Sequence, residues 1–269
     1  MPVTEAPRGE SAKSVLKIEW QYPVFKEAEK ATTGSVAKAA RRALAMQDAL
    51  KFIAGDDPRP LLVLRECKVC NGTDDALLSK GADNERTFLL STWFHCVKLP
   101  VDVLESNHPF YEMFGHEDPE HLFVALPDGS MKVKLESDTS RTELWSAMNE
   151  VLAAAYKDDP QSALKAVQKT LDRMDVIDTR LLDLRAKRNE LLEKEGASSK
   201  KLLKVNLEIE EAKQEIATLL AHVAKARQLE LKRGTVGSAG GAAPAGSGST
   251  GSGAPGSGSP GAGEAKAKN

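Results

Sequence analysis

The sequence has few cysteines and no long apolar run. Its three cysteines among 269 residues are too few for a disulfide-stapled scaffold. No apolar run approaches the roughly 18 to 20 residues that span a bilayer, and the first twenty residues lack the apolar core of a secretory signal. Lys and Arg total 37 against 39 Asp and Glu, so no positive excess favours nucleic acid or a membrane surface. These absences predict a cytoplasmic protein that binds neither.

Both ends of the chain lack the apolar residues that a core requires. Residues 234–269 are almost entirely Gly, Ala, Ser, Pro and Thr, and they hold twelve of the 20 glycines. Ordering a residue costs on the order of 1 to 2 kcal/mol of backbone entropy, and these side chains bury too little to offset that cost. Residues 1–12 carry prolines and a glycine among charges. We therefore expect disorder in 1–12 and 234–269.

Residues 158–233 have the apolar spacing of a helical coiled coil, with alternating steps of three and four. Asp159-Pro160 suits the start of one helix, and Gly196 to Ser199 suits its end and the start of the next. The seam shifts phase near Asp178. We predict an antiparallel hairpin of two helices of about 35 residues each. The two helices either cover each other's apolar stripes, or leave part of these stripes open to a partner or a second copy.

The expected seam residues are Leu164, Val167, Leu171, Met174, Ile177, Leu181, Leu184, Leu191, Leu202, Val205, Ile209, Ala212, Ile216, Leu219, Val223 and Ala226.

Residues 13–157 alternate between strand-like and helical stretches. The predicted strands are 15–20, 60–65, 87–96, 122–126 and 131–135, of which the last two form a β-hairpin. The predicted helices are 36–53, 73–80 and 141–156, with a helical turn at 109–115. A strand, a crossover helix and a second strand imply a parallel pair whose carboxyl ends share one edge of the sheet.

Cys67 and Cys70 stand three residues apart, directly after the strand predicted at 60–65. The first sulfur then lies near unpaired N–H groups at a helix start, which stabilise a thiolate, and Lys68 adds a nearby cation. A thiolate attacks disulfides, and a second cysteine three residues on can resolve the mixed disulfide. The spacing therefore predicts dithiol exchange. Metal binding, which normally needs a second such pair or histidines, and two inert cysteines are the alternatives.

Three stretches of the chain resemble the thioredoxin-like family: PLLVLRECKVC at 60–70, TFLLSTWFHCVKL at 87–99 and HLFVALPDGSMKV at 121–133. The resemblance implies an α/β fold, a thioredoxin-like three-layer α/β/α domain over 13–157. It also implies Cys67 as the attacking thiol and Cys70 as the resolving thiol. We expect no cofactor and no metal for this chemistry.

The chain departs from the family pattern around the motif. Arg65 and Glu66 stand where the family has a tryptophan before the first cysteine, and Lys68-Val69 replaces a Gly-Pro pair. Glu66 could raise the pKa of the neighbouring thiol and so oppose Lys68. The family's cis-proline before the strand at 122–126 falls near His121, whereas Pro119 stands two residues earlier, so either the loop has shifted or the proline is lost. We expect a trans bond at His121, because a cis non-proline bond costs about 2.5 to 4 kcal/mol.

Cys96 is the third cysteine. If the strand at 87–96 runs parallel to the strand at 60–65, then Cys96 and His95 end at the same edge as the motif. Cys96 could act there as a third redox thiol, or join the motif cysteines and a histidine such as His121 around a metal. The plainer interpretation is a small buried hydrophobe at a strand end.

The sequence thus predicts a thiol-disulfide oxidoreductase that acts on protein disulfides, with the hairpin at 158–233 providing the contact to its protein substrate or partner. The alternative is a non-enzymatic adaptor. It would keep the thioredoxin-like scaffold as a binding module and use the coiled coil for docking or for homo-oligomer formation. The departures around Cys67 and Cys70 support this alternative.

Overall fold

The computed structural model describes residues 7–24, 43–67, 77, 82–114, 117, 119–136 and 138–232. They belong to the first of the two units into which the chain divides, Met1–Gly237 and Ser238–Asn269. The tail predicted at 234–269 lies outside the described residues. The strands are β1 (Leu61–Arg65), β2 (His95–Leu99), β3 (Leu122–Ala125) and β4 (Val133–Leu135). The helices are α1 (Glu10–Lys13), α2 (Met46–Ala54), α4 (Glu85–Ser91), α5 (Arg141–Ala155), α6 (Pro160–Glu195) and α7 (Lys200–Ala226), with short 3-10 helices at Ala82–Asn84, Val101–Leu104 and Tyr111–Met113.

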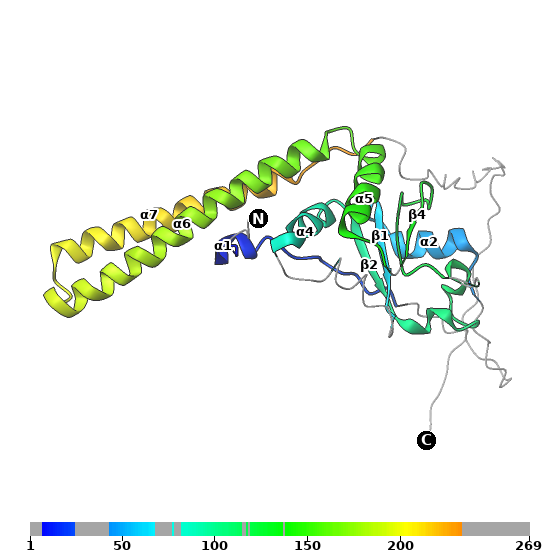
Figure 1. The fold of residues 1–269 in the computed structure, drawn as a ribbon, viewed down its shortest axis with the longest axis horizontal. Coiled ribbons are helices and arrows are strands. Elements are labelled where there is room, and N and C mark those ends of the chain that lie inside the picture. The colour runs from blue at the N-terminus through cyan, green and yellow to red at the C-terminus, as the bar shows by residue number, and fades with distance from the viewer. Residues whose placement is uncertain are drawn as a thin grey trace, which may run out of the picture. The chain divides into compact units, whose positions relative to one another are not determined.

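The four strands form one mixed sheet in the order β2-β1-β3-β4 (Figure 1). β1 and β2 are parallel, with Leu62 opposite Cys96, whereas β3 is antiparallel to both β1 and β4. The strand predicted at 60–65 thus has a parallel neighbour, β2, and the strands predicted at 122–126 and 131–135 pair as an antiparallel β-hairpin. All five residues of β1 are buried, as expected for a central strand that is covered on both faces.

Side chains alternate between two cores on opposite faces of the sheet, because successive strand residues point to opposite sides. Leu62 and Leu64 belong to a core shared with α4, α5 and the first turns of α6. Leu61 and Val63 belong to a second core with α2 and the aromatic residues around Tyr111–Met113. The fold is thus a mixed α/β structure with helices against both faces.

The predicted hairpin at 158–233 is present as α6 and α7, which lie side by side (Figure 1). Asp159 caps α6 ahead of Pro160, Gly196 ends it at φ +76°, and Ser199 caps α7, as the sequence indicated. α6 has 36 residues but α7 only 27. The chain leaves the helix after Ala226, and Leu231 then pairs with Tyr156 in an antiparallel bridge.

The predicted seam is largely buried. Its distal half forms a core of its own, and its proximal half joins the core on one face of the sheet. The buried seam residues are Leu164, Val167, Leu171, Met174, Ile177, Leu181, Leu184, Leu202, Val205, Ile209, Ala212 and Val223. The first turns of α6 therefore pack on the same core as β1 and α5.

The prediction of a strand at 87–96 is wrong. Glu85–Ser91 forms the helix α4, and the strand begins only at His95. Residues 87 to 91 are all buried, so this helix has no polar face to reveal its period, and a short apolar run fits a buried strand equally well. Glu85 in the first turn suits the positive end of the helix dipole.

Two other sequence expectations differ from the structure. Residues 15–20 form no strand, although Gln21 bridges to Val97 beside β2. The helix predicted at 36–53 begins only at Met46, because the amide of Leu44 is bonded to the Pro109 carbonyl at 2.8 Å. Its first residues, and most of the helix predicted at 73–80, lie outside the described residues; Leu77 is helical and buried.

The segment 7–12, expected to be loose, is bound to α6. The Arg8 guanidinium contacts Glu85 at 2.6 Å, Asp172 at 2.6 Å and Asp175 at 2.7 Å. Ser11 donates to both carboxylate oxygens of Asp178, at 2.8 Å from its amide and 2.7 Å from its hydroxyl. Three aspartates at successive steps of three on α6 thus hold this segment, and Ala12 is fully buried behind it.

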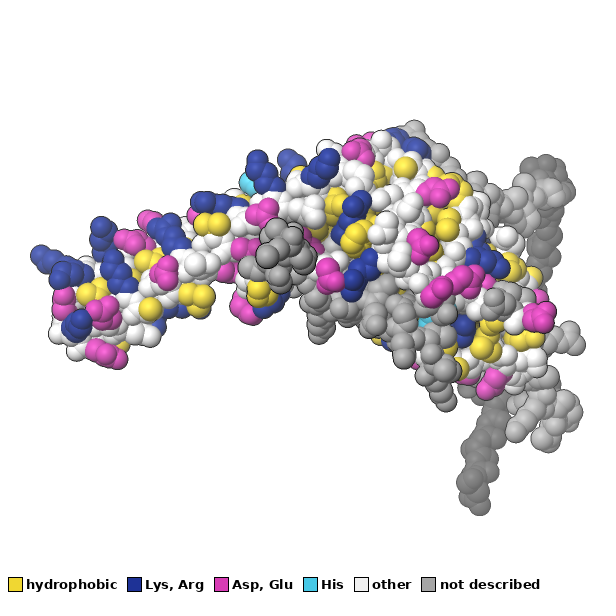
Figure 2. Space-filling model, in the orientation of Figure 1, with side chains coloured by type: hydrophobic (Ala, Val, Ile, Leu, Met, Phe, Trp, Pro, Cys, Tyr) yellow, Lys and Arg dark blue, Asp and Glu magenta, His cyan; other side chains and the backbone are white. Residues whose placement is uncertain are grey.

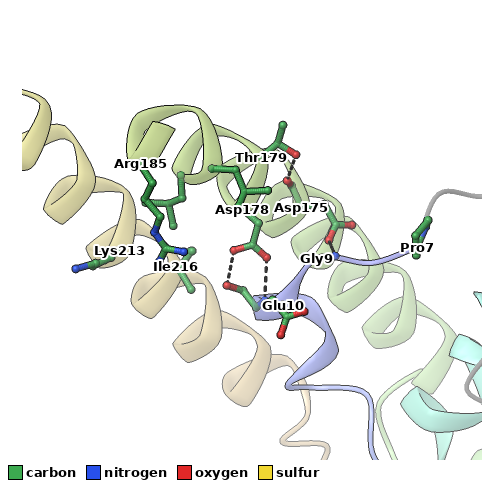
Figure 3. A pocket seen from close by; sticks show the side chains of 12 residues that line it. Pro7, Gly9, Glu10, Asp175, Asp178, Thr179, Arg185, Lys213 and Ile216 are labelled. Carbon is green, nitrogen blue, oxygen red and sulfur yellow. Dashed lines mark hydrogen bonds between the residues drawn. The ribbon is translucent and has the colours of Figure 1, made fainter. Parts of the chain in front are cut away.

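Gly9 is required where this segment passes closest to α6. Its amide donates to Asp175 at 2.7 Å, and a Cβ atom at this position would lie only 2.4 Å from a carboxylate oxygen of Asp178 (Figure 3). The N-terminal segment thus makes its polar contacts with α6 where the seam shifts phase near Asp178.

Candidate active site

Cys67 lies two residues beyond the end of β1, at the carboxyl edge of the parallel pair. The preceding residue continues the strand pairing, because the amide of Glu66 donates to the Leu99 carbonyl at 2.8 Å. Cys67 is partly exposed and is disulfide-bonded. Cys70 and Lys68 lie outside the described residues. The structure therefore places the predicted attacking residue at the edge where the sequence put it.

Cys96 does not lie at that edge, contrary to the expectation from a strand at 87–96. It is the second residue of β2 and stands opposite Leu62, five residues before Cys67. At about 3.3 Å per residue, this offset amounts to about 16 Å along the strand. Cys96 is a free thiol, and burial raises its pKa to about 12. These features match the plainer interpretation of Cys96 as a buried hydrophobe.

His95, which was expected beside Cys96 at the motif edge, instead supports the opposite end of the sheet. Its Nδ1 atom lies 2.9 Å from Asp57 and its Nε2 atom 3.0 Å from the Ile53 carbonyl. Asp57 is also bound by Arg59 at 2.6 Å, and these bonds lower its pKa against the opposing effect of burial. The group ties the end of α2 to the start of β2.

Glu66 is the carboxylate nearest to Cys67 in sequence, and it is paired. Lys98 of β2 lies 2.9 Å from it, with 21% of the lysine side chain exposed against 45% of the glutamate. Lys98 and Glu66 therefore form a half-exposed ion pair. The charge that could oppose a Cys67 thiolate is compensated locally by this cation.

Arg65, Glu120 and His121 form a buried polar group beside the motif. Their exposed fractions are 6%, 2% and 4%. The Glu120 carboxylate contacts Lys132 and lies 3.6 Å from Lys134. Burial opposes its ionisation, but the bond to Lys132 and the charges of both lysines hold its pKa below the usual range. The sequence drew attention to Arg65 only as a departure from the family, and it gave no sign of Glu120.

His121 is trans, as expected, since no cis peptide bond occurs among the described residues. Its carbonyl accepts from the Arg65 amide at 2.9 Å. Within the ranges described above, no three His, Cys, Asp or Glu residues are grouped so that they could hold a metal ion. A metal site that includes Cys70 falls outside those ranges.

A hollow of about 640 Å³ lies elsewhere, between the N-terminal segment and the groove of α6 and α7 (Figure 3). Leu181, Leu182 and Ile216 contribute its apolar lining. Its carboxylates Asp175 and Asp178 are already bound by the backbone of the N-terminal segment. The Ser11 hydroxyl in its lining bonds to Asp178 as part of the contact that holds the N-terminal segment on α6, and its described lining residues include no His or Cys, so we do not regard it as the active site.

Comparison with family models, with curated proteins and with solved structures finds no match for this chain. Function is therefore inferred from the residues and their geometry. Among the helices that the structure describes, none combines the length and the apolarity that crossing a bilayer requires.

Proposed function

We propose that the protein is a thiol-disulfide oxidoreductase of the thioredoxin-like type, acting on protein disulfides through Cys67 and Cys70. One observation carries the proposal: Cys67 is partly exposed and disulfide-bonded just beyond a central parallel strand. Since Cys96 is free and buried, we infer that Cys70 is the partner in this disulfide. The alternatives of metal binding or two inert cysteines require no such bond.

The reaction would proceed in two exchanges. The Cys67 thiolate attacks one sulfur of the substrate disulfide, forming a mixed disulfide and releasing the other substrate sulfur as a thiolate. The Cys70 thiolate then attacks the Cys67 sulfur, which releases the second substrate thiol and leaves the Cys67–Cys70 disulfide. Two electrons pass from the protein to the substrate. An external dithiol must return them before the next cycle.

The arrangement of strands supports the thioredoxin-like part of the proposal. β1 ends at the motif and pairs in parallel with β2, and the antiparallel β3–β4 hairpin and α5 follow in chain order. The resemblance rests on a strand before the motif, a second strand and a terminal hairpin, and all three are present, although the second strand begins at His95 and not at residue 87. Helices contact both faces of the sheet, as the resemblance implies.

Insulin reduction with dithiothreitol as the electron donor tests the proposal. We expect wild type to precipitate insulin faster than dithiothreitol alone, and Cys67→Ser to fall to that background. Cys96→Ser is the matched control, because it removes a thiol that is buried away from the motif; it should retain the wild-type rate. Equal rates for wild type and Cys67→Ser would refute the proposed oxidoreductase activity.

A second candidate, the non-enzymatic adaptor, is favoured by leucines on the outside of the hairpin. Leu203 and Leu207 lie one turn apart on α7, with 59% and 66% of their surface exposed. Figure 2 shows acidic and basic side chains interspersed along the two helices, with apolar groups between them. Such a surface could dock a protein partner or a second copy.

Sedimentation of the full chain and of the double variant Leu203→Lys, Leu207→Lys tests docking between copies. Removing 158–233 would be a poor test, because Leu164 and Leu171 belong to the core that covers the sheet. A wild-type dimer that the double variant abolishes supports the adaptor with self-association. A wild type that is monomeric at all concentrations excludes the second copy as its partner.

A further inference from the structure

Arg65 donates hydrogen bonds to three consecutive carbonyl groups. Its amide bonds to His121 at 2.9 Å, its Nε atom to Glu120 at 3.2 Å and its second terminal nitrogen to Pro119 at 3.1 Å. A single side chain and its own backbone thus fix the whole segment 119–121. No lysine could reproduce this, because the planar guanidinium presents several donors in a fixed fork.

Burying the charged Arg65 guanidinium at the end of β1 costs free energy, because the charge loses its hydration. Arg65 is 6% exposed, and burial lowers the pKa of its guanidinium, with Glu120 opposing that effect. An apolar side chain of similar length would fill the end of β1 without desolvating a charge. We therefore attribute the arginine at this position to its role in holding the segment 119–121 in place, more than to a gain in the stability of the fold.

The segment is also held from the side of β4. Glu120 contacts Lys132 and lies near Lys134, while its backbone is bound by Arg65 of β1. Glu120 is thus held at its backbone carbonyl from β1 and at its side-chain carboxylate from the side of β4. Because β3 runs antiparallel to β1, the residues that precede β3 lie beside the residues that follow β1, and Cys67 is among these.

We propose that Arg65 is a positioning residue for disulfide exchange, which fixes the segment 119–121 as the wall past which a substrate disulfide reaches the Cys67 sulfur. This inference rests on the proposed function. Arg65 acts through the segment and not on the reacting sulfurs. The carbonyls of Pro119 and Glu120 accept from Arg65, so their backbone is fixed on the segment that precedes β3.

The test compares Arg65→Met, which keeps the length and removes the donors, with Arg65→Lys, which keeps the charge. Arg59→Met is the matched control, since Arg59 precedes β1 at its other end and bonds to Asp57 and the Thr92 carbonyl. We expect Arg65→Met to raise KM for insulin about tenfold with kcat within about twofold. Arg65→Lys should recover part of this loss, and Arg59→Met should leave KM unchanged. An unchanged KM in Arg65→Met, or an equal rise in Arg59→Met, overturns the proposal.

A second readout needs no activity. The reduced proteins are treated with iodoacetamide and, separately, with a maleimide carrying a polyethylene glycol chain, and Cys67 labelling is followed by mass spectrometry. A displaced wall should change the ratio of the two rates about threefold or more in Arg65→Met and not in Arg59→Met.

If wild type fails to reduce insulin but this ratio changes, the proposed oxidoreductase activity is refuted, and the positioning of segment 119–121 by Arg65 is supported. If wild type reduces insulin and the ratio is the same in all variants, the role of Arg65 fails. Arg65→Lys keeps both tests available should Arg65→Met not fold.

Discussion

Cys96 stands directly opposite Leu62 in the parallel pair of β1 and β2, whereas Cys67 follows the far end of β1. The two cysteines therefore lie at different ends of the same strand pair. Only Cys67 is at the edge where β1 ends and the segment before β3 passes. This separation assigns one cysteine to the candidate chemistry and the other to the core.

Alkylation should distinguish the two thiols. After mild reduction at pH 8, we expect iodoacetamide to modify Cys67 within minutes, because it is partly exposed. Cys96 should react only after unfolding, because burial holds its pKa near 12 and little thiolate forms. Mass spectrometry of peptides from native and urea-treated samples measures both. Rapid labelling of Cys96 in the native protein would contradict its assignment to the core.

Arg8→Ala should destabilise the fold by about 1 to 3 kcal/mol, because three carboxylates then lose a charged donor. The Arg8 side chain is only 17% exposed, so solvent replaces its bonds poorly. The comparison is Lys13→Ala, whose pair with Glu10 at 3.5 Å is exposed and should contribute less than about 0.5 kcal/mol. Urea unfolding measures both. Equal effects would show that the N-terminal segment is not fastened by Arg8.

Glu120 should make stability depend on pH in the acid range. Its pKa is lowered in the folded protein, so the unfolded chain binds the proton more tightly. The contribution is complete above the unfolded pKa of about 4.3 and is lost as pH falls through the folded value. We expect Glu120→Gln to reduce the fall in free energy of unfolding between pH 5 and pH 3. Lys132→Met should act in the same direction, because it removes the hydrogen bond that contributes most to lowering the Glu120 pKa against the opposing effect of burial. An unaltered pH slope in both variants would contradict this.

The hairpin offers a matched pair on one helix. Ile209 is 4% exposed in the seam, and Leu207 is 66% exposed on the outside of α7. We expect Ile209→Ala to lower the free energy of unfolding by about 2 to 4 kcal/mol, because it leaves a cavity in the distal core. Leu207→Ala should change it by less than about 0.5 kcal/mol. A large loss in Leu207→Ala would mean that a second chain covers this face in solution.

Local periodicity predicted the elements that have a clear apolar face or clear caps. β1 reads as a central strand because it is a continuous apolar run, and the seam of α6 and α7 follows steps of three and four. Asp159, Gly196 and Ser199 mark the helix ends by their own backbone chemistry. These signals lie within a few residues of the structure that they specify.

The same reasoning failed for α4, and the error moved a candidate site residue. The last five residues of α4 are all buried and show no period, so 87–96 read as a strand, and Cys96 was expected at the end of that strand. The true strand begins at His95, which reverses the position of Cys96 along the sheet. One wrong element therefore put a third thiol at the motif.

Long-range polar contacts could not be predicted from the sequence. Arg65 and Glu120 are 55 residues apart, and nothing local indicates that one holds the backbone of the other. The N-terminal segment left a clearer trace, since Asp172, Asp175 and Asp178 repeat at steps of three on one side of α6. Such a row of acids beside an apolar seam could have indicated a bound polar segment.

The most direct measurement equilibrates the protein across a series of reduced-to-oxidised glutathione ratios, traps the thiols with acid and alkylating reagent, and identifies the disulfides by mass spectrometry. The account predicts that Cys67 and Cys70 oxidise together in one two-electron step, while Cys96 stays a thiol throughout. A Cys67 that stays reduced at every ratio, or that bonds only to glutathione or to Cys96, would contradict it.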